Sequence, residues 1–172
     1  MNLTYANTTH DDVETLVSIR ITAMQESLTR IGRFDPQRAR ARFLSSFDPA
    51  YCKFIVANGA NVGFFLAKPD DAFLTLEHLY ILPEHQGKGI GAAVLASIVA
   101  DADARSLPVK VGALRESASN RFYQRHGFRK VDGRAVHEGL LGDARLLGRR
   151  REDARRAGRR LDAHGRSRDD RR

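Results

Sequence analysis

The residues from Leu74 to Ala92, LTLEHLYILPEHQGKGIGA, constrain the fold more than any other stretch of this 172-residue chain. Their first half is rich in apolar residues and is the most strand-like segment of the sequence. Gly87, Gly89 and Gly91 then alternate with two other residues, and a helix-like run, Ala92–Ala104, follows. A strand, a glycine loop and a helix in this order build an anion cradle, because glycines let the backbone approach a phosphate and the helix start offers unpaired N–H groups.

Three classes of phosphate-bearing ligand use loops of this kind. The phosphate loop of nucleotide hydrolases needs G-x4-G-K followed by Ser or Thr, whereas Lys88 is followed by glycine and no hydroxyl is placed to bind magnesium. The dinucleotide pattern G-x-G-x-x-G/A is matched in letters from Gly87 to Ala92, but Pro83–Gln86 separate it from the strand and too little chain follows for a doubly wound sheet. Coenzyme A is the third ligand, and no metal site is predicted.

Hydrophobic periodicity predicts an α/β domain around this stretch. A first strand, Asn2–Asn7, precedes a helix to about Leu28, and a second helix begins at Asp35-Pro36 with an N-cap residue and Pro at the first helical position. Three strands then form an antiparallel meander with a turn at Asn58-Gly59, and a helical crossover makes the next strand parallel to its neighbour. The expected later elements are the strands Tyr51–Ala57, Val62–Ala67, Ala72–Leu82, Val109–Leu114 and Phe128–Val131, and a short helix to about Arg125 that Gly127 ends.

Charge separates the chain into two parts. The stretch from Gly142 to Arg172 contains twelve Arg and six acidic residues, so residues 1–141 carry only +2 of the total charge of +8. We expect a folded domain over residues 1–141 and an Arg-rich tail over 142–172 that is disordered or loosely helical. The domain lacks a uniformly basic face, which assigns any electrostatic binding of nucleic acid to the tail alone.

Cysteine usage and hydropathy bear on the cellular setting. The single Cys52 excludes an internal disulfide and lies in an apolar run, so we interpret it as a buried strand residue in a reducing compartment. No apolar run approaches the roughly 20 residues of a membrane span, and the N-terminus lacks the features of a signal peptide. We therefore expect a cytoplasmic protein with no membrane partner.

Two motifs carry a family resemblance. Gln86–Gly91, Q-G-K-G-I-G, matches the Q/R-x-x-G-x-G/A signature of the GCN5-related N-acetyltransferase (GNAT) family. Downstream, Ser119–Phe128, SNRFYQRHGF, resembles the second marker of that family, an aromatic-Tyr pair four residues before Gly-Phe. Their separation and the order of elements also fit, so residues 2–138 resemble a GNAT domain.

The resemblance implies a mixed, mostly antiparallel sheet of six to seven strands, flanked by about four helices and splayed open between strands 4 and 5. Acetyl-CoA lies in that opening in such enzymes, as the acetyl donor for a primary amine. The implied cofactor contacts are the strand backbone at Leu79, Tyr80 and Ile81, the loop residues Gln86, Gly87, Lys88, Gly89, Ile90, Gly91 and Ala92, and the amide of Asn120. A common family pattern places that Asn where this chain has Glu116.

The same resemblance implies the catalytic groups. Tyr123 matches the general acid near the coenzyme A sulfur, and its alternative interpretation is a packing aromatic beside Phe122. A carboxylate in the fourth strand often serves as the base, which indicates Glu77, with His78 or no dedicated base as alternatives. Strand alternation places Glu77 on the same face as Leu79 and places His78 on the other face.

The acceptor remains a small-molecule or peptide amine at this stage. By family analogy the first two helices cover its site, and the candidate lining residues are Arg20, Met24, Arg30, Arg33 and Phe34. The resemblance leaves a homodimer open. A non-catalytic acyl-CoA-binding or regulatory domain of the same fold is the alternative function.

Overall fold

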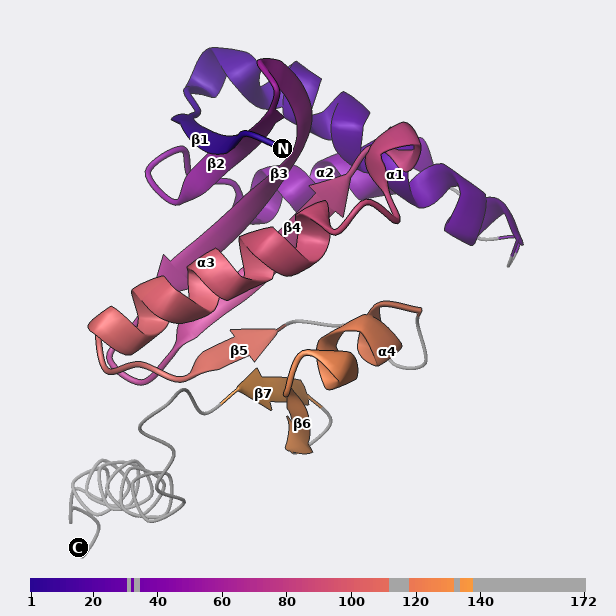
Figure 1. Cartoon of the computed structure of the whole chain (residues 1–172). Coiled ribbons are helices and arrows are strands. Elements are labelled where there is room, and N and C mark those ends of the chain that lie inside the picture. Colours follow the sequence, from indigo (N-terminus) through magenta and orange to yellow (C-terminus); the bar gives the residue numbers. More distant parts are fainter. Residues whose placement is uncertain (31, 33–34, 112–117, 132–133, 138–172) are drawn as a thin grey trace, which may run out of the picture. The chain divides into compact units, whose positions relative to one another are not determined.

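The computed structural model describes residues 1–30, 32, 35–111, 118–131 and 134–137, and the statements below concern these residues (Figure 1). They form one seven-stranded sheet in the order β1-β2-β3-β4-β5-β7-β6. The strands are β1 Leu3–Asn7, β2 Cys52–Ala57, β3 Ala60–Pro69, β4 Leu74–Ile81, β5 Val109–Val111, β6 Arg129–Val131 and β7 Arg134–His137. The helices are α1 Val13–Arg30, α2 Pro36–Ser46, α3 Ile90–Ala104 and α4 Ala118–Arg125, with short 3-10 turns η1 His10–Asp12 and η2 Pro83–His85.

The predicted antiparallel meander is confirmed. β1, β2, β3 and β4 pair in antiparallel order, and β5 is parallel to β4, as a helical crossover requires. Ala57 pairs with Ala60, so the β2–β3 connection has two residues, Asn58 and Gly59, both with positive φ. That conformation belongs to the tight hairpin turn whose twist matches the flanking strands. The sheet also contains β7, Arg134–His137, which is not among the strands predicted above from hydrophobic periodicity, and the tail lies outside the described residues.

Local capping explains where the helices begin. The Asp35 side chain accepts a hydrogen bond from the Arg38 amide, and Pro36 takes the first helical position of α2. Thr9 and Asp12 form a capping box ahead of α1. α3 begins at Ile90 rather than at the predicted Ala92, because Gly89 takes the left-handed N-cap conformation.

Two apolar cores cover the two faces of the sheet. One core joins the sheet to α3 and Tyr123 of α4, and the other joins it to α1 and to Phe43 of α2. In Figure 1 α3 accordingly runs along one side of the sheet while α1 and α2 lie on the other. Among the described helices none is long and apolar enough to cross a membrane.

β4 is irregular at the centre of the sheet. Leu66 of β3 pairs with His78 and Ala67 pairs with Leu76, so Glu77 is the extra residue of a β-bulge. Of the described pairs, β4 joins β5 only from Leu74 to Leu76. Beyond the bulge β4 has described strand partners on β3 alone, and residues 112–117, which follow β5, lie outside the described residues. The opening expected between strands 4 and 5 therefore stays a prediction.

Candidate active site

The second half of β4 presents backbone groups toward β5. The Leu82 amide donates to the Val62 carbonyl at 2.9 Å, which fixes the direction of alternate residues in an antiparallel pair. Tyr80 therefore directs its backbone groups toward β3, whereas Leu79 and Ile81 direct theirs toward the other edge of β4, on the side of β5. Leu79, Tyr80 and Ile81 were all expected to pair with pantetheine, but the backbone groups of Tyr80 face β3 instead.

Gly63 of β3 keeps β4 in this place. A methyl group at Gly63 would lie 2.1 Å from the Tyr80 carbonyl oxygen, well inside any allowed contact. Only glycine lets the two strands approach this closely. This requirement could not be predicted from the sequence, because the contact joins residues that are distant along the chain.

The glycine loop links β4 to α3. Gly87 and Gly89 have φ of 71° and 80°, and a methyl group at either would meet nothing within 4 Å, so both are required by backbone conformation. The Gln86 side-chain amide donates to the Ile81 carbonyl at 2.8 Å and ties the loop back to β4. Lys88 is exposed beside them.

The first turn of α3 meets the loop without a side-chain cap. Gly89 is the N-cap and makes no side-chain hydrogen bond, so the N–H groups at the start of α3 have no cap of this kind. The side chain of Ile90 is buried in the core, so only its backbone can contribute to an anion site at the loop. Gly91 and Ala92 are half-buried. Unpaired N–H groups at the start of a 15-residue helix attract an anion such as a diphosphate.

α4 lies against the beginning of α3. A methyl group at Gly91 would come 3.4 Å from the Phe122 ring, so the two helices touch where the glycine loop ends. Tyr123, next along α4, is 7% exposed and packs on Phe122 and Phe128 with ring centroids 5.2 and 5.5 Å away. Asn120, one turn before Tyr123, is half-buried.

Burial changes the chemistry of Tyr123. Loss of solvent, with a smaller effect of the nearby Tyr80 phenol, raises the pKa of Tyr123 to about 12. Its hydroxyl makes no hydrogen bond to any other described residue. The side chain is therefore a protonated phenol at neutral pH. It is also close enough to β4 for the Tyr80 phenol to affect its pKa.

Glu77 occupies the bulge, so strand alternation alone does not determine its face. Its Oε2 is buried and lacks a hydrogen-bond partner among the described residues. Bulges are frequent beside active sites, where they redirect a side chain. A carboxylate with an unsatisfied oxygen at this point can accept a proton or bind a donor.

His78 belongs to the opposite face, as the alternation predicts. Its ring packs against Phe43, Phe64 and Tyr80, and its Nε2 lies 2.9 Å from the Ser46 hydroxyl. Burial, then the positive charges of Arg20 and Lys68, lowers the pKa of His78 to about 4. The half-buried imidazole is neutral near pH 7 and packs beside Phe43 and Phe64 of the α1–α2 core, while its Nδ1, like Glu77 Oε2, lacks a hydrogen-bond partner among the described residues. Its role as the alternative base stays a prediction.

The predicted acceptor residues separate into different roles. Arg20 is 6% exposed, donates through Nε to the Tyr80 hydroxyl at 3.2 Å and through Nη1 to the Ala39 carbonyl, and so joins α1 to β4 and α2. Arg20 therefore connects these elements instead of lining the predicted acceptor site. Met24 is half-buried, Arg30 borders an open hollow beside α1, and Arg33 and Phe34 lie outside the described residues.

Comparison with known proteins agrees with this geometry. Residues 50–130 match the family model described as an acetyltransferase (GNAT) domain, while a search of curated proteins finds no match. The PaiA N-acetyltransferase of Thermoplasma acidophilum, solved in complex with coenzyme A, is 18% identical with a TM-score of 0.60 and covers 79% of this chain and 97% of its own. The ribosomal-protein-S18-alanine N-acetyltransferase of Escherichia coli is 17% identical with a TM-score of 0.60, covering 83% of this chain and 98% of its own.

A third solved structure, a GNAT-family acetyltransferase from Elizabethkingia anophelis with acetyl-CoA bound, is 19% identical with a TM-score of 0.54 and covers 76% of this chain and 78% of its own. At these identities the likeness concerns the fold, which is that of an α/β acetyltransferase. Residues 50–130, which match the acetyltransferase (GNAT) domain model, lie within this fold, so this part of the chain is similar in sequence to a GNAT domain.

Proposed function

We propose that the chain is an N-acetyltransferase that transfers the acetyl group of acetyl-CoA directly to a primary amine in a ternary complex. The observation that carries the proposal is the convergence of three elements. The uncapped start of α3 follows the glycine loop, the loop is tied to Ile81 of β4, and the buried Tyr123 of α4 belongs to the apolar core that also contains residues of α3 and β4. The coenzyme A bound to the Thermoplasma acidophilum protein and the acetyl-CoA bound to the Elizabethkingia anophelis protein support the same choice of co-substrate.

The chain offers groups for each part of acetyl-CoA. The N–H groups from Gly87 to Ala92 would hold the pyrophosphate, and Lys88 would add a positive charge at the exposed side. The carbonyl group of Leu79 and the amide of Ile81 would pair with the pantetheine arm as an added strand does. Asn120, on the side of α4 that carries Tyr123, would contact the same arm.

Catalysis requires the amine to lose a proton and the leaving sulfur to be stabilised. Glu77 would accept the proton, directly or through water, as the amine nitrogen attacks the thioester carbonyl carbon. The backbone N–H of Leu79 faces the β5 side of β4 and would stabilise the negative charge that develops on the carbonyl oxygen. The carbon–sulfur bond then breaks and yields the N-acetyl product and coenzyme A.

Tyr123 would act on the sulfur mainly as a hydrogen-bond donor. A thiol has a pKa of about 8.5, so complete proton transfer from a phenol of pKa about 12 is uphill by about 5 kcal/mol. A hydrogen bond to the developing thiolate stabilises the transition state without completed transfer. Solvent then protonates the coenzyme A thiolate to give the free thiol.

Thiol release from acetyl-CoA in the presence of a panel of amines tests the proposal. We expect at least one amine to raise thiol release well above the rate of acetyl-CoA hydrolysis, with the N-acetyl product found by mass spectrometry. A folded protein that binds acetyl-CoA but releases no thiol with any amine would instead be a non-catalytic acyl-CoA-binding domain.

A further inference from the structure

The exposed face of α1 carries an unbroken row of uncharged hydrogen-bonding side chains. The members of this row, called the α1 stripe below, recur at helical spacing of three and four residues and are Thr15, Ser18, Thr22, Gln25 and Thr29. All five are exposed. Solvated helix faces are usually rich in Lys, Glu and Arg, so an exposed stripe of five positions without a charge is unusual for a solvated face.

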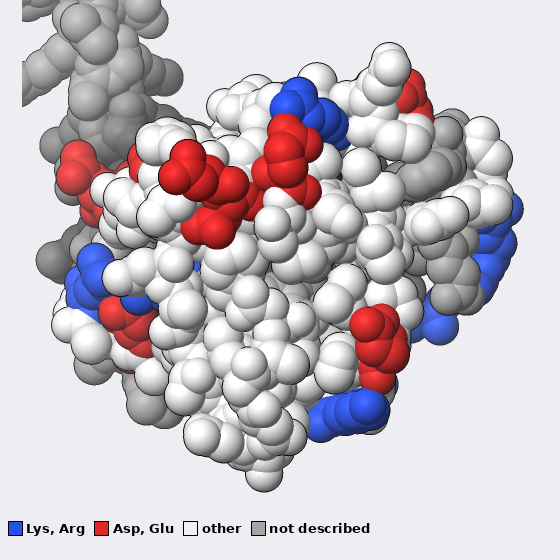
Figure 2. All heavy atoms as spheres, turned by 90° about the horizontal axis from the view of Figure 1, so that it is seen from above, with Lys and Arg blue, Asp and Glu red and all other residues white. Residues whose placement is uncertain are grey.

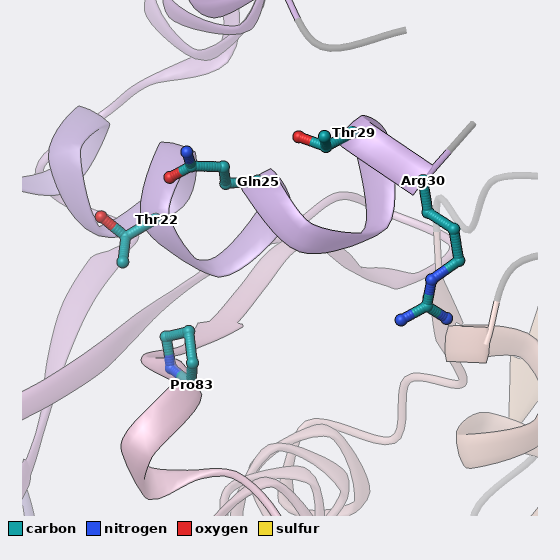
Figure 3. A pocket seen from close by; sticks show the side chains of 5 residues that line it. All are labelled: Thr22, Gln25, Thr29, Arg30 and Pro83. Carbon is teal, nitrogen blue, oxygen red and sulfur yellow. The ribbon is translucent and has the colours of Figure 1, made fainter. Parts of the chain in front are cut away.

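Figure 2 views the side of the molecule along which α1 runs and shows a broad uncharged area with charged side chains toward its margins. Two adjoining hollows lie along the stripe. One, of about 640 Å³, is lined by Thr22, Gln25, Thr29, Arg30 and Pro83, and Figure 3 shows the four α1 side chains above the Pro83 ring. The other, of about 470 Å³, is lined by Glu14, Thr15, Ser18, Ile19, Thr22 and Leu82.

The two hollows form one groove because they share Thr22 and because Leu82 and Pro83 are consecutive. From Thr15 to Thr29 the helix rises about 21 Å, which is the length of about six residues of extended polypeptide. A compact acceptor would fill one hollow, whereas an elongated ligand is needed to fill both.

The chemistry of the groove selects among elongated ligands. Hydroxyl and amide side chains both donate and accept hydrogen bonds, which suits a peptide main chain with one donor and one acceptor at nearly every residue. A polyamine or an aminoglycoside needs carboxylates, and the carboxylate of Glu14, the sole one among the described lining residues, is already paired with Arg40. A nucleic acid needs a row of Lys and Arg, which the stripe lacks.

The groove also has a defined relation to β4. Leu82, at its wall, follows Leu79 by three residues, or about 10 Å along the strand. An amine placed beside Glu77 and Leu79 is therefore separated from the groove by about three extended peptide residues. An acceptor shorter than this would not reach the α1 stripe.

We propose that the acceptor is the amino terminus of a polypeptide whose residues from about the fourth onward lie along the α1 stripe. This inference rests on the proposed acetyltransferase function and assigns its substrate class. The bound segment is extended, and its main chain supplies most of the hydrogen bonds.

The test measures kcat/KM by thiol release for uncharged peptides of two, four, six and ten residues that share one N-terminal sequence. We expect at least a tenfold rise from the dipeptide to the decapeptide, with most of it beyond four residues. Thr22→Arg places a bulky charge in the wall common to both hollows and should remove most of that rise, and Ser18→Arg should do the same. Ser97→Arg, at an exposed position of α3, is the matched control and should retain the full rise.

Different results overturn different claims. If small amines are acetylated but kcat/KM does not change with peptide length, or if a polyamine or an aminoglycoside exceeds the decapeptide, the inference is wrong and the acetyltransferase function stands. If acetyl-CoA neither binds nor releases thiol with any amine, the proposed function itself fails.

Discussion

Replacing Tyr123 by Phe separates the catalytic from the packing interpretation of this side chain. The substitution removes one oxygen atom from a ring that is 7% exposed and packs on Phe122 and Phe128. Since the hydroxyl makes no hydrogen bond to another described residue, its removal should leave the free energy of unfolding within about 1 kcal/mol of the wild type. The packing interpretation alone therefore predicts almost no effect.

The catalytic interpretation predicts a clear loss of turnover. General acids contribute about 10²- to 10⁴-fold, but a phenol of pKa about 12 donates incompletely to a thiolate. We therefore expect kcat to fall about 10- to 100-fold, equivalent to about 1.4 to 2.7 kcal/mol of transition-state stabilisation. The dissociation constant of acetyl-CoA should change less than threefold.

The assay combines steady-state thiol release, acetyl-CoA calorimetry and urea denaturation on the same preparation. Tyr5→Phe makes the same chemical change on β1, at the far edge of the sheet from α4, and should leave kcat unchanged. An unaltered kcat in folded Tyr123→Phe would refute the role of the hydroxyl. A loss of acetyl-CoA affinity as large as the loss of kcat/KM would make it a binding group.

Three further predictions concern the loop, the strand contact and the half-buried imidazole. Gly89→Ala should weaken acetyl-CoA binding at least fivefold in calorimetry, because φ of 80° costs alanine about 1 kcal/mol or more and disfavours the loop conformation that would bind the cofactor. Gly59→Ala is the control, since φ is 84° there but the residue lies in the hairpin. It should lose a similar amount of stability and no acetyl-CoA affinity. Gly63→Ala should lower the free energy of unfolding by about 3 kcal/mol or more in urea denaturation, because its methyl would lie 2.1 Å from a β4 carbonyl oxygen, and a loss under 1 kcal/mol would contradict this. The pKa of His78 is about 4 in the folded protein, below the 6.5 of a free imidazole, so its contribution to the free energy of unfolding is complete above pH 6.5 and decreases by about 3 kcal/mol as the pH falls toward 4. His78→Gln should flatten the stability profile in that window, and an unchanged slope would show that the imidazole is not responsible.

The sequence was sufficient for features that depend on neighbouring residues. Asp35-Pro36 predicted the start of α2, Asn58-Gly59 predicted the hairpin, and the glycine loop between β4 and α3 was correctly placed. These signals are local, because caps, tight turns and positive φ values restrict the residue types at single positions. The pattern of strands and helices then determined the order of the meander and the parallel β5.

The features that escaped prediction depend on contacts between distant residues. The bulge at Glu77 arises from the register of β4 against β3, which no periodicity in β4 alone reveals. Arg20 was expected near the acceptor but is buried as a clamp on Tyr80 and Ala39, since only the packing of α1 on β4 decides its direction. Glycine is required at position 63 for the same kind of reason, because its contact with the Tyr80 carbonyl oxygen joins residues that are distant along the chain. The roles of Glu77, Asn120 and Tyr123 stay predictions.

Amide chemical-shift mapping during titration with coenzyme A tests most directly whether the glycine loop and the edge of β4 form the cofactor site. We predict saturable shifts that are largest for the amides of Gly87 to Ala92 and for Leu79 and Ile81, with small shifts in the hairpin at Asn58 and Gly59. Absence of saturable shifts in the folded protein, or shifts concentrated in the hairpin rather than in the loop, would contradict the assignment of this site.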